Sequence, residues 1–165
     1  MTADEIPVCY NYGCAATAQV KITGKELVQI RQLFTKLADA HAERAAIAQA
    51  IGLFEYFSGT QSPTFRDKGG NVNDDGADGR MDCIDHSTNT TTYLHLLEEK
   101  GYLKFHRVLP RVKRAPLLFD EHWSAAIEEI DTQHDFAVDS WFFDNGHPAA
   151  IFDLDKWKSG ATPDA

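Results

Sequence analysis

The chain has 165 residues, of which 43% are hydrophobic, enough for one core, so we expect a single domain over residues 1–165. Its formal net charge is -9, which argues against a nucleic-acid or anionic-membrane partner, because such partners attract clustered Lys and Arg. No stretch approaches the roughly 20 apolar residues of a membrane span, and the start of the chain lacks the basic and apolar regions of a signal peptide.

The first half of the chain predicts two helices after an irregular entry. Residues 1–24 hold Pro and Gly among aromatic residues, which predicts an irregular or short-stranded segment. Apolar residues at spacings of three and four predict an amphipathic helix from Lys25, carrying Leu27, Ile30, Phe34 and Leu37. A second, alanine-rich helix is predicted from Ala40 to Gly59. Residues 58–80 are rich in Gly, Asn and Asp and predict a long loop, which in a compact domain is usually functional.

The second half changes from helix to strand. Asp82 is a suitable N-cap for a helix over residues 83–100, and Gly101 stands where a left-handed terminator belongs. Strands are predicted over residues 102–109, 122–130 and 136–142, the last two as a hairpin, followed by a short helix over residues 151–158. The basic residues 107–114 predict a solvated loop. Helices followed by antiparallel strands indicate an α+β fold.

Three residues stand where a cysteine enzyme needs them. Cys83 begins the third predicted helix, His122 begins a predicted strand, and Asp139 lies in the next strand. A helix N-terminus and a nearby imidazolium both stabilise a thiolate, and a carboxylate on the neighbouring strand can hold the imidazole tautomer. We therefore predict Cys83 as nucleophile, His122 as base and Asp139 as its orienting group.

At these residues the sequence resembles the transglutaminase-like branch of the papain-type cysteine enzymes, including bacterial proteins of that superfamily. The matching text is Met81-Asp-Cys-Ile-Asp, His122-Trp-Ser-Ala-Ala-Ile and Ala137-Val-Asp-Ser-Trp, within residues 80–142. The resemblance implies a papain-like core, with the N-terminal helices and the nucleophile helix packed on a C-terminal antiparallel sheet. It also implies acyl transfer through a Cys-His-Asp triad. Asp82 and Ile84 replace the familiar Gly-x-Cys-Trp context of the nucleophile.

The other two cysteines bear on the compartment. If Cys83 stays reduced, Cys9 and Cys14 are the only pair free to form a disulfide, and two buried thiols are the alternative. A bridge indicates an oxidising compartment. The start Met1-Thr-Ala-Asp-Glu is compatible with a trimmed mature end carrying an added methionine, so we expect an exported or periplasmic form rather than a cytoplasmic one.

The remaining site predictions concern oxygen and metal ligands. The second oxyanion donor is left open among four upstream side chains: Gln61, Asn73, Tyr10 and Asn11. The acidic glycine loop partly follows a calcium-loop pattern, with Asn71, Asn73, Asp75 and Asp82 as candidate Ca²⁺ ligands. A zinc site is a further alternative, formed by Cys83, His86, His122 and Asp139.

These expectations converge on a thiol enzyme. The predicted activity is hydrolysis of a peptide or amide bond in a peptide or protein substrate, with no required cofactor. Transfer of the acyl group to an amine, as in a transglutaminase, uses the same residues and remains an alternative. A non-catalytic peptide-binding domain with bound calcium is the alternative from another class.

Overall fold

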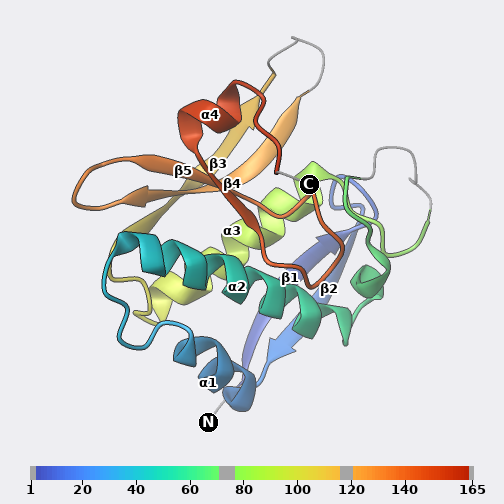
Figure 1. Cartoon of the computed structure of the whole chain (residues 1–165). Helices are drawn as coiled ribbons and strands as arrows, with labels where there is room; N and C mark the ends of the chain where they lie inside the picture. The colour runs from blue at the N-terminus through green and yellow to red at the C-terminus, as the bar shows by residue number, and fades with distance from the viewer. Residues whose placement is uncertain (1–2, 71–76, 116–120, 164–165) are drawn as a thin grey trace.

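The computed structural model describes residues 3–70, 77–115 and 121–163. The described residues form an α+β arrangement, as predicted, with an antiparallel β1–β2 hairpin and a four-stranded antiparallel sheet in the order β3-β4-β5-β6. In Figure 1 the helix α3 (Cys83–Glu99) passes between this sheet and the hairpin. The elements that hold the candidate site therefore meet around one central helix.

The entry segment is a hairpin, and its loop is tight. Strands β1 (Asp4–Tyr10) and β2 (Ala16–Ile22) pair in antiparallel register and bury alternate residues, namely Ile6, Val8, Val20 and Ile22. The loop between them contains four consecutive residues with positive φ, which are Asn11, Tyr12, Gly13 and Cys14. A left-handed backbone of this kind turns the chain sharply and directs several amide groups to one side.

The predicted helices form, with one shorter than expected. Helix α1 (Gly24–Gln32) begins with a capping box between Thr23 and Glu26 and ends before Phe34 and Leu37, because the chain turns away through a positive φ at Lys36. Helix α2 (Ala40–Gly59) has the predicted bounds, with Asp39 as its N-cap. A short 3₁₀ helix, η1 (Pro63–Arg66), follows.

Helix α3 ends as its sequence predicts. Gly101, with a φ of 75°, follows the C-cap Lys100, and a left-handed residue at this place is the usual end of a helix. Its buried side chains join one core with α2, the hairpin and the sheet, including Tyr93, Leu94, Leu97, Phe54, Ala125 and Val138. Burial of side chains of this size contributes roughly 1.5–3 kcal/mol each, so packing rather than helix propensity holds α3 in place.

The basic segment is a strand, which corrects the predicted loop. Strand β3 (His106–Arg114) pairs with β4 (His122–Glu129) along the edge of the sheet, and Arg107 forms an ion pair with Glu128 across the two strands. The sheet tolerates Pro110 because it lies on an edge strand where the register shifts between Leu109 and Val112. Cross-strand pairing has outweighed the loop signal of the charge run.

The C-terminal segment differs from prediction in its first residues. Strand β6 (Ala150–Asp153) pairs with β5 (Asp135–Asp139), so the helix predicted from residue 151 begins only at Leu154 as α4 (Leu154–Lys158). Asp153 caps that helix through its side chain. Trp157, on α4, is fully buried. Figure 1 shows α4 on the other side of the sheet from α3.

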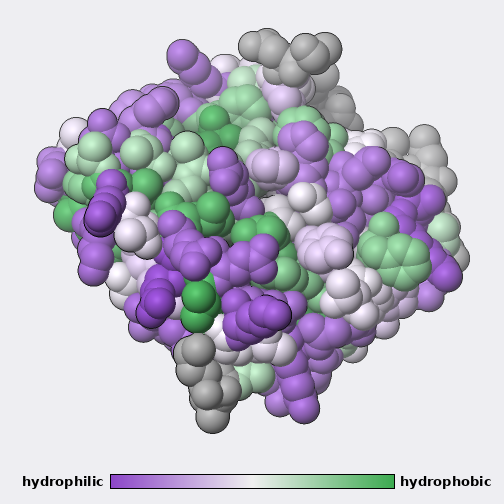
Figure 2. Space-filling view, turned by 60° about the horizontal axis from the view of Figure 1, so that its bottom comes forward, coloured by the Kyte–Doolittle hydropathy of each residue, from purple (hydrophilic) through white to green (hydrophobic). Residues whose placement is uncertain are grey.

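The surface agrees with the acidic, polar composition. Hydrophilic side chains dominate the face in Figure 2, with hydrophobic groups in smaller areas between them. The large hydrophobic side chains that the described residues expose are Tyr56, Phe65 and Ile130. Within the described ranges, no helix combines the length and the hydrophobicity that crossing a bilayer requires.

Candidate active site

Cys83 occupies the first position of α3 because the preceding residue caps the helix. The Asp82 side chain accepts a hydrogen bond from the Asp85 amide, and Asp85 reaches back to the Asp82 amide, which completes a capping box. Cys83 is a free and partly exposed thiol. The predicted N-cap is confirmed, and it places the sulfur-bearing residue at the positive end of the helix dipole.

His122 and Asp139 form a buried pair at one end of the sheet. β4 begins at His122 and β5 ends at Asp139, and antiparallel pairing brings these two ends together. The His122 Nε2 and Asp139 Oδ2 atoms lie 2.7 Å apart. The indole Nε1 of Trp157 donates to the same oxygen at 2.9 Å, and the amide of Trp141 donates to Oδ1 at 3.1 Å. Asp139 is thus held as a carboxylate acceptor with a defined orientation.

The Cys83 thiol completes this constellation. Burial lowers the pKa of His122, but hydrogen bonds to Asp139 and Cys83, together with their charges, outweigh burial and raise it to about 9. Since Nε2 bonds the carboxylate, Nδ1 is the ring nitrogen left to face the sulfur. The structure therefore brings Cys83, His122 and Asp139 together in the predicted order of contacts.

Aromatic rings surround the imidazole. The ring centroid of His122 lies 4.8 Å from that of Trp141, 5.7 Å from that of Phe142 and 5.9 Å from that of Trp157. Trp141 and Phe142 lie in the predicted strand that carries Asp139, but Trp157 lies in the predicted terminal helix. No local pattern connects it to Asp139, from which it is separated by 18 positions.

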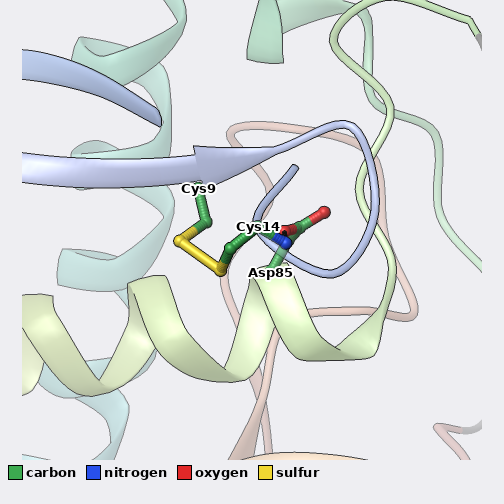
Figure 3. A group of neighbouring side chains, drawn as sticks. All are labelled: Cys9, Cys14 and Asp85. Atoms are coloured by element: carbon green, nitrogen blue, oxygen red, sulfur yellow. Dashed lines mark hydrogen bonds between the residues drawn. A yellow bond between two sulfur atoms is a disulfide. The ribbon is translucent and has the colours of Figure 1, made fainter. Parts of the chain in front are cut away.

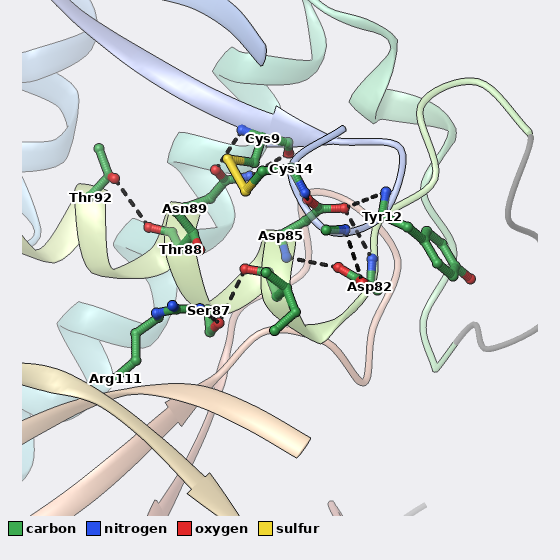
Figure 4. Close-up of a disulfide and its surroundings, with 12 residues drawn as sticks. Cys9, Tyr12, Cys14, Asp82, Asp85, Ser87, Thr88, Asn89, Thr92 and Arg111 are labelled. Atoms are coloured by element: carbon green, nitrogen blue, oxygen red, sulfur yellow. Dashed lines mark hydrogen bonds between the residues drawn. A yellow bond between two sulfur atoms is a disulfide. The ribbon is translucent and has the colours of Figure 1, made fainter. Parts of the chain in front are cut away.

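The β1–β2 loop covers the start of the nucleophile helix. Cys9 and Cys14 form a disulfide with a Cα–Cα distance of 4.6 Å, which decides between the two alternatives for these cysteines. The amides of Tyr12 and Cys14 donate to Asp85, at 2.8 and 2.7 Å. Figure 3 shows Asp85 beside the loop that the disulfide closes, and Figure 4 shows these bonds in their surroundings. The bridged loop therefore holds the turn of α3 that carries Cys83.

We expect the Cys9→Ala/Cys14→Ala double variant to lose about 2 kcal/mol of unfolding free energy, from the entropy of a six-residue closed loop. The loss arises because the unfolded chain without the bridge has more conformational freedom. In the folded variant, the loop amides that donate to Asp85 must also be positioned without the covalent link. Urea denaturation of the two proteins measures it, with Cys83→Ala as the cysteine control. Equal unfolding free energies for the double variant and wild type would show that the bridge does not support the loop.

The structure shows where some of the candidate calcium and zinc ligands lie. Of the candidate calcium ligands, Asn71, Asn73 and Asp75 lie outside the described residues, and Asp82 accepts amide bonds from Asp85 and Gly13 as a helix cap. The zinc alternative required His86 beside Cys83, but the structure directs His86 to other partners. Among the described residues, the only group of potential ligands within mutual reach is Cys9, Cys14 and Asp85, and its two sulfurs are bonded to each other.

Two of the four candidate oxyanion donors have other partners. The Gln61 amide donates to the Lys21 carbonyl and its oxygen accepts from the Lys21 amide, so it fastens the 3₁₀ region to β2. The Asn11 side chain donates to Asp78 and accepts from the Gly79 amide. Tyr10 ends β1, and Asn73 lies outside the described residues. The second oxyanion donor remains a prediction without an assigned residue.

A second buried His-Asp pair lies beneath the site, and the sequence did not reveal it. His86 Nε2 lies 2.7 Å from Asp67 Oδ2, and His86 Nδ1 lies 2.9 Å from the Ser140 hydroxyl. Asp67 also accepts the Met81 amide at 2.9 Å. The pair therefore connects the residues just before Cys83 with the residue after Asp139. From the sequence, His86 was predicted only as a ligand of the alternative zinc site.

Glu55 is the unusual member of this buried network. Its Oε2 lies 3.8 Å from His86 Nδ1, and among the described residues neither carboxylate oxygen has a hydrogen-bond partner. Burial raises the pKa of Glu55 to about 8, against the opposing charge of His86 and with the help of Asp67. At neutral pH Glu55 is therefore mostly uncharged, which avoids the cost of burying a carboxylate that has no donor.

A comparison of this chain with known protein families, curated proteins and solved structures finds no match.

Proposed function

We propose that this protein is a cysteine-dependent acyl-transfer enzyme with a papain-like, transglutaminase-like arrangement. The observation that carries the proposal is that His122 contacts Asp139 through Nε2 and lies near enough to Cys83 for both groups to raise its pKa. A partly exposed thiol at a helix start, next to an imidazole oriented by a buried carboxylate, is the arrangement that activates a sulfur nucleophile. The order of helix, base strand and acid strand agrees with the resemblance of the three motifs.

The reaction follows from these roles. The Cys83 thiolate attacks the carbonyl carbon of a peptide or amide, so that a carbon–sulfur bond forms and the carbon–nitrogen bond breaks. The His122 imidazolium gives its proton to the departing amine. The neutral imidazole then takes a proton from water, which attacks the thioester, so that the carbon–sulfur bond breaks, the acid is released and the thiolate–imidazolium pair is restored. Asp139 keeps the ring in place throughout through its bond to Nε2.

Transfer to an amine requires only that an amine replaces water in the second step. We favour hydrolysis because His122 already supplies the base that activates water, and no described residue identifies an amine-binding partner. Incubating the protein with a library of activated acyl probes and then with either buffer or a primary amine separates the two outcomes. Mass spectrometry should show acylation at Cys83 in wild type and none in Cys83→Ala.

The result with the amine decides the acceptor. If the acyl group disappears as free acid even with excess amine, the enzyme is a hydrolase. If it is recovered as an amide, the transglutaminase alternative holds. Acylation distributed over exposed lysines, and unchanged in Cys83→Ala, would contradict the enzyme proposal and favour a binding domain.

We further propose that the protein works in an oxidising compartment. The Cys9–Cys14 bridge supports this, because cytosolic reductants keep most such pairs reduced. Blocking free thiols in source cells before lysis and measuring the mass of the protein tests the proposal. One blocked thiol, at Cys83, supports it, and three blocked thiols would contradict it.

A further inference from the structure

The basic strand β3 contains cations with very different surroundings. Arg107 pairs with Glu128, and Arg114 donates to the carbonyls of Trp157 and Ala161 at 2.7 and 2.8 Å. Arg111 is different, because its hydrogen-bond partner is the Ser87 hydroxyl, at 3.1 Å. Within the described ranges it has no carboxylate partner, although it is only partly exposed.

Arg111 lies close to the proposed nucleophile. Ser87 follows Cys83 by four positions in α3, and residues at this spacing share a helix face, with their Cβ atoms about 5–6 Å apart. Figure 4 shows the Arg111 side chain extending from β3 to Ser87 on α3. The guanidinium group is therefore held about one helical turn from the thiol-bearing residue.

The guanidinium group of Arg111 lies over an aromatic ring of β4, the strand that carries the proposed base His122. The Arg111 Cζ atom lies 5.0 Å from the ring centroid of Trp123, the residue after His122. The Lys113 Nζ atom lies 5.7 Å from the same centroid, and Lys113 is the cross-strand partner of Trp123. Trp123 shares a strand face with the core residues Ala125 and Ile127, so it lies on the α3 side of the sheet. Two cations thus lie over one ring on the strand that His122 begins.

The orientation of Arg111 is fixed while most of its donors stay available. The Ser87 hydroxyl donates to the Ile84 carbonyl at 3.2 Å, which leaves its lone pairs for Arg111. A guanidinium has five N–H donors in a planar fork, and the bond to Ser87 uses only one of them. That fork matches a carboxylate, which binds it through two parallel hydrogen bonds. Lys113 differs from Arg111 in having a carboxylate partner, since its Nζ atom lies 3.4 Å from Glu121 Oε1, so it is the secondary cation of the two.

We propose that Arg111, assisted by Lys113, binds a carboxylate of the substrate, so that the enzyme acts on acyl donors with an acidic group next to the scissile carbonyl. The inference rests on the proposed function and adds the substrate class, which is an acidic peptide. A carboxylate about one residue from the carbonyl that Cys83 attacks lies within reach of the guanidinium. Arg111 is a specificity residue in this scheme and takes no part in bond breaking.

A pair of matched alkylating probes tests the proposal without knowledge of the natural substrate. N-iodoacetylglycine carries its carboxylate one residue from the reactive carbon, and N-iodoacetylglycinamide is its neutral counterpart. In wild type we expect Cys83 to react about 10-fold faster with the acid, as one charge-assisted contact predicts. In Arg111→Gln the acid-to-amide rate ratio should fall close to one, and in Lys113→Gln it should fall partly.

The control is Arg107→Gln, on the same strand but paired with Glu128, which should keep the wild-type ratio. Circular dichroism of each variant reports folding, and Lys113→Gln, at an exposed position, keeps the test available if Arg111→Gln does not fold. Rapid labelling of Cys83 by both probes with a ratio near one in wild type would overturn this inference alone. Slow labelling by both would overturn the proposed function and this inference with it.

Discussion

The His122→Ala variant should react with iodoacetamide at Cys83 about 100-fold more slowly than wild type near pH 6, the size of effect usual for a positioned base. Hydrogen bonds to Asp139 and Cys83 raise the pKa of His122 to about 9 despite its burial, so the wild-type imidazole is an imidazolium through the neutral range. That positive charge stabilises the thiolate, which is the form that reacts. Labelling reactions quenched at a series of times and analysed by peptide mass spectrometry measure the rate.

The difference in labelling rate between wild type and His122→Ala should depend on pH. As the pH rises through about 9, wild type loses the imidazolium, while the thiol of the variant ionises without help. The difference between the two rates should therefore shrink from pH 6 to above pH 9. Asp139→Asn is the companion variant, because it keeps an acceptor for Trp157 and removes the charge, and it should give an intermediate rate. Equal rates for all three proteins at pH 6 would show that His122 does not activate Cys83.

The second large effect concerns the stability of the buried network. Because the folded-state pKa of Glu55 is raised to about 8 from 4.5, the folded protein holds a proton that the unfolded chain releases. Stability from this group is therefore complete below pH 4.5 and decreases as the pH rises toward 8. The decrease is roughly 1.4 kcal/mol for each pH unit of that window, a few kcal/mol in all.

The Glu55→Gln variant should remove this dependence. We expect its unfolding free energy to lie close to that of wild type at pH 5 and to exceed it by a few kcal/mol at pH 9, since the amide stays neutral. Urea denaturation at a series of pH values measures the difference, with the exposed Glu5→Gln as the matched control. The raised pKa of His122 acts in both proteins and cancels in the comparison, whereas the charge of Glu55 itself helps to raise the pKa of His86, so the measured difference includes the loss of that interaction. Parallel curves for Glu55→Gln and wild type would contradict a buried, protonated Glu55.

Local sequence patterns were sufficient to predict features whose geometry depends on residues close together in the chain. The cap at Asp82, the left-handed end at Gly101 and the bounds of α2 depend on backbone groups a few residues apart, and all three predictions are confirmed. Local sequence patterns were insufficient to predict strands whose pairing partners are distant in sequence. The basic segment became β3 because β4 pairs with it, and residues from Ala150 became β6 because β5 has a free edge there.

The same division applies to the candidate site. Cys83 and His122 could be selected because each begins a recognisable element, and Asp139 because it lies in the strand predicted to follow as the other half of a hairpin. Trp157 could not be connected with Asp139, nor Arg111 with Ser87, because those contacts depend on how α4 and β3 pack in space. The buried group of Glu55, Asp67 and His86 was hidden for the same reason.

The sequence by itself determined the α+β order, the start of the nucleophile helix and the three residues proposed for catalysis, since these follow from capping and periodicity within short segments. Only the tertiary structure decided that Cys9 and Cys14 are joined, that their loop holds Asp85 and that a guanidinium stands beside the thiol-bearing helix. The physical reason is that hydrogen bonds and ion pairs depend on distances of a few ångströms between side chains, and the fold alone brings remote segments that close.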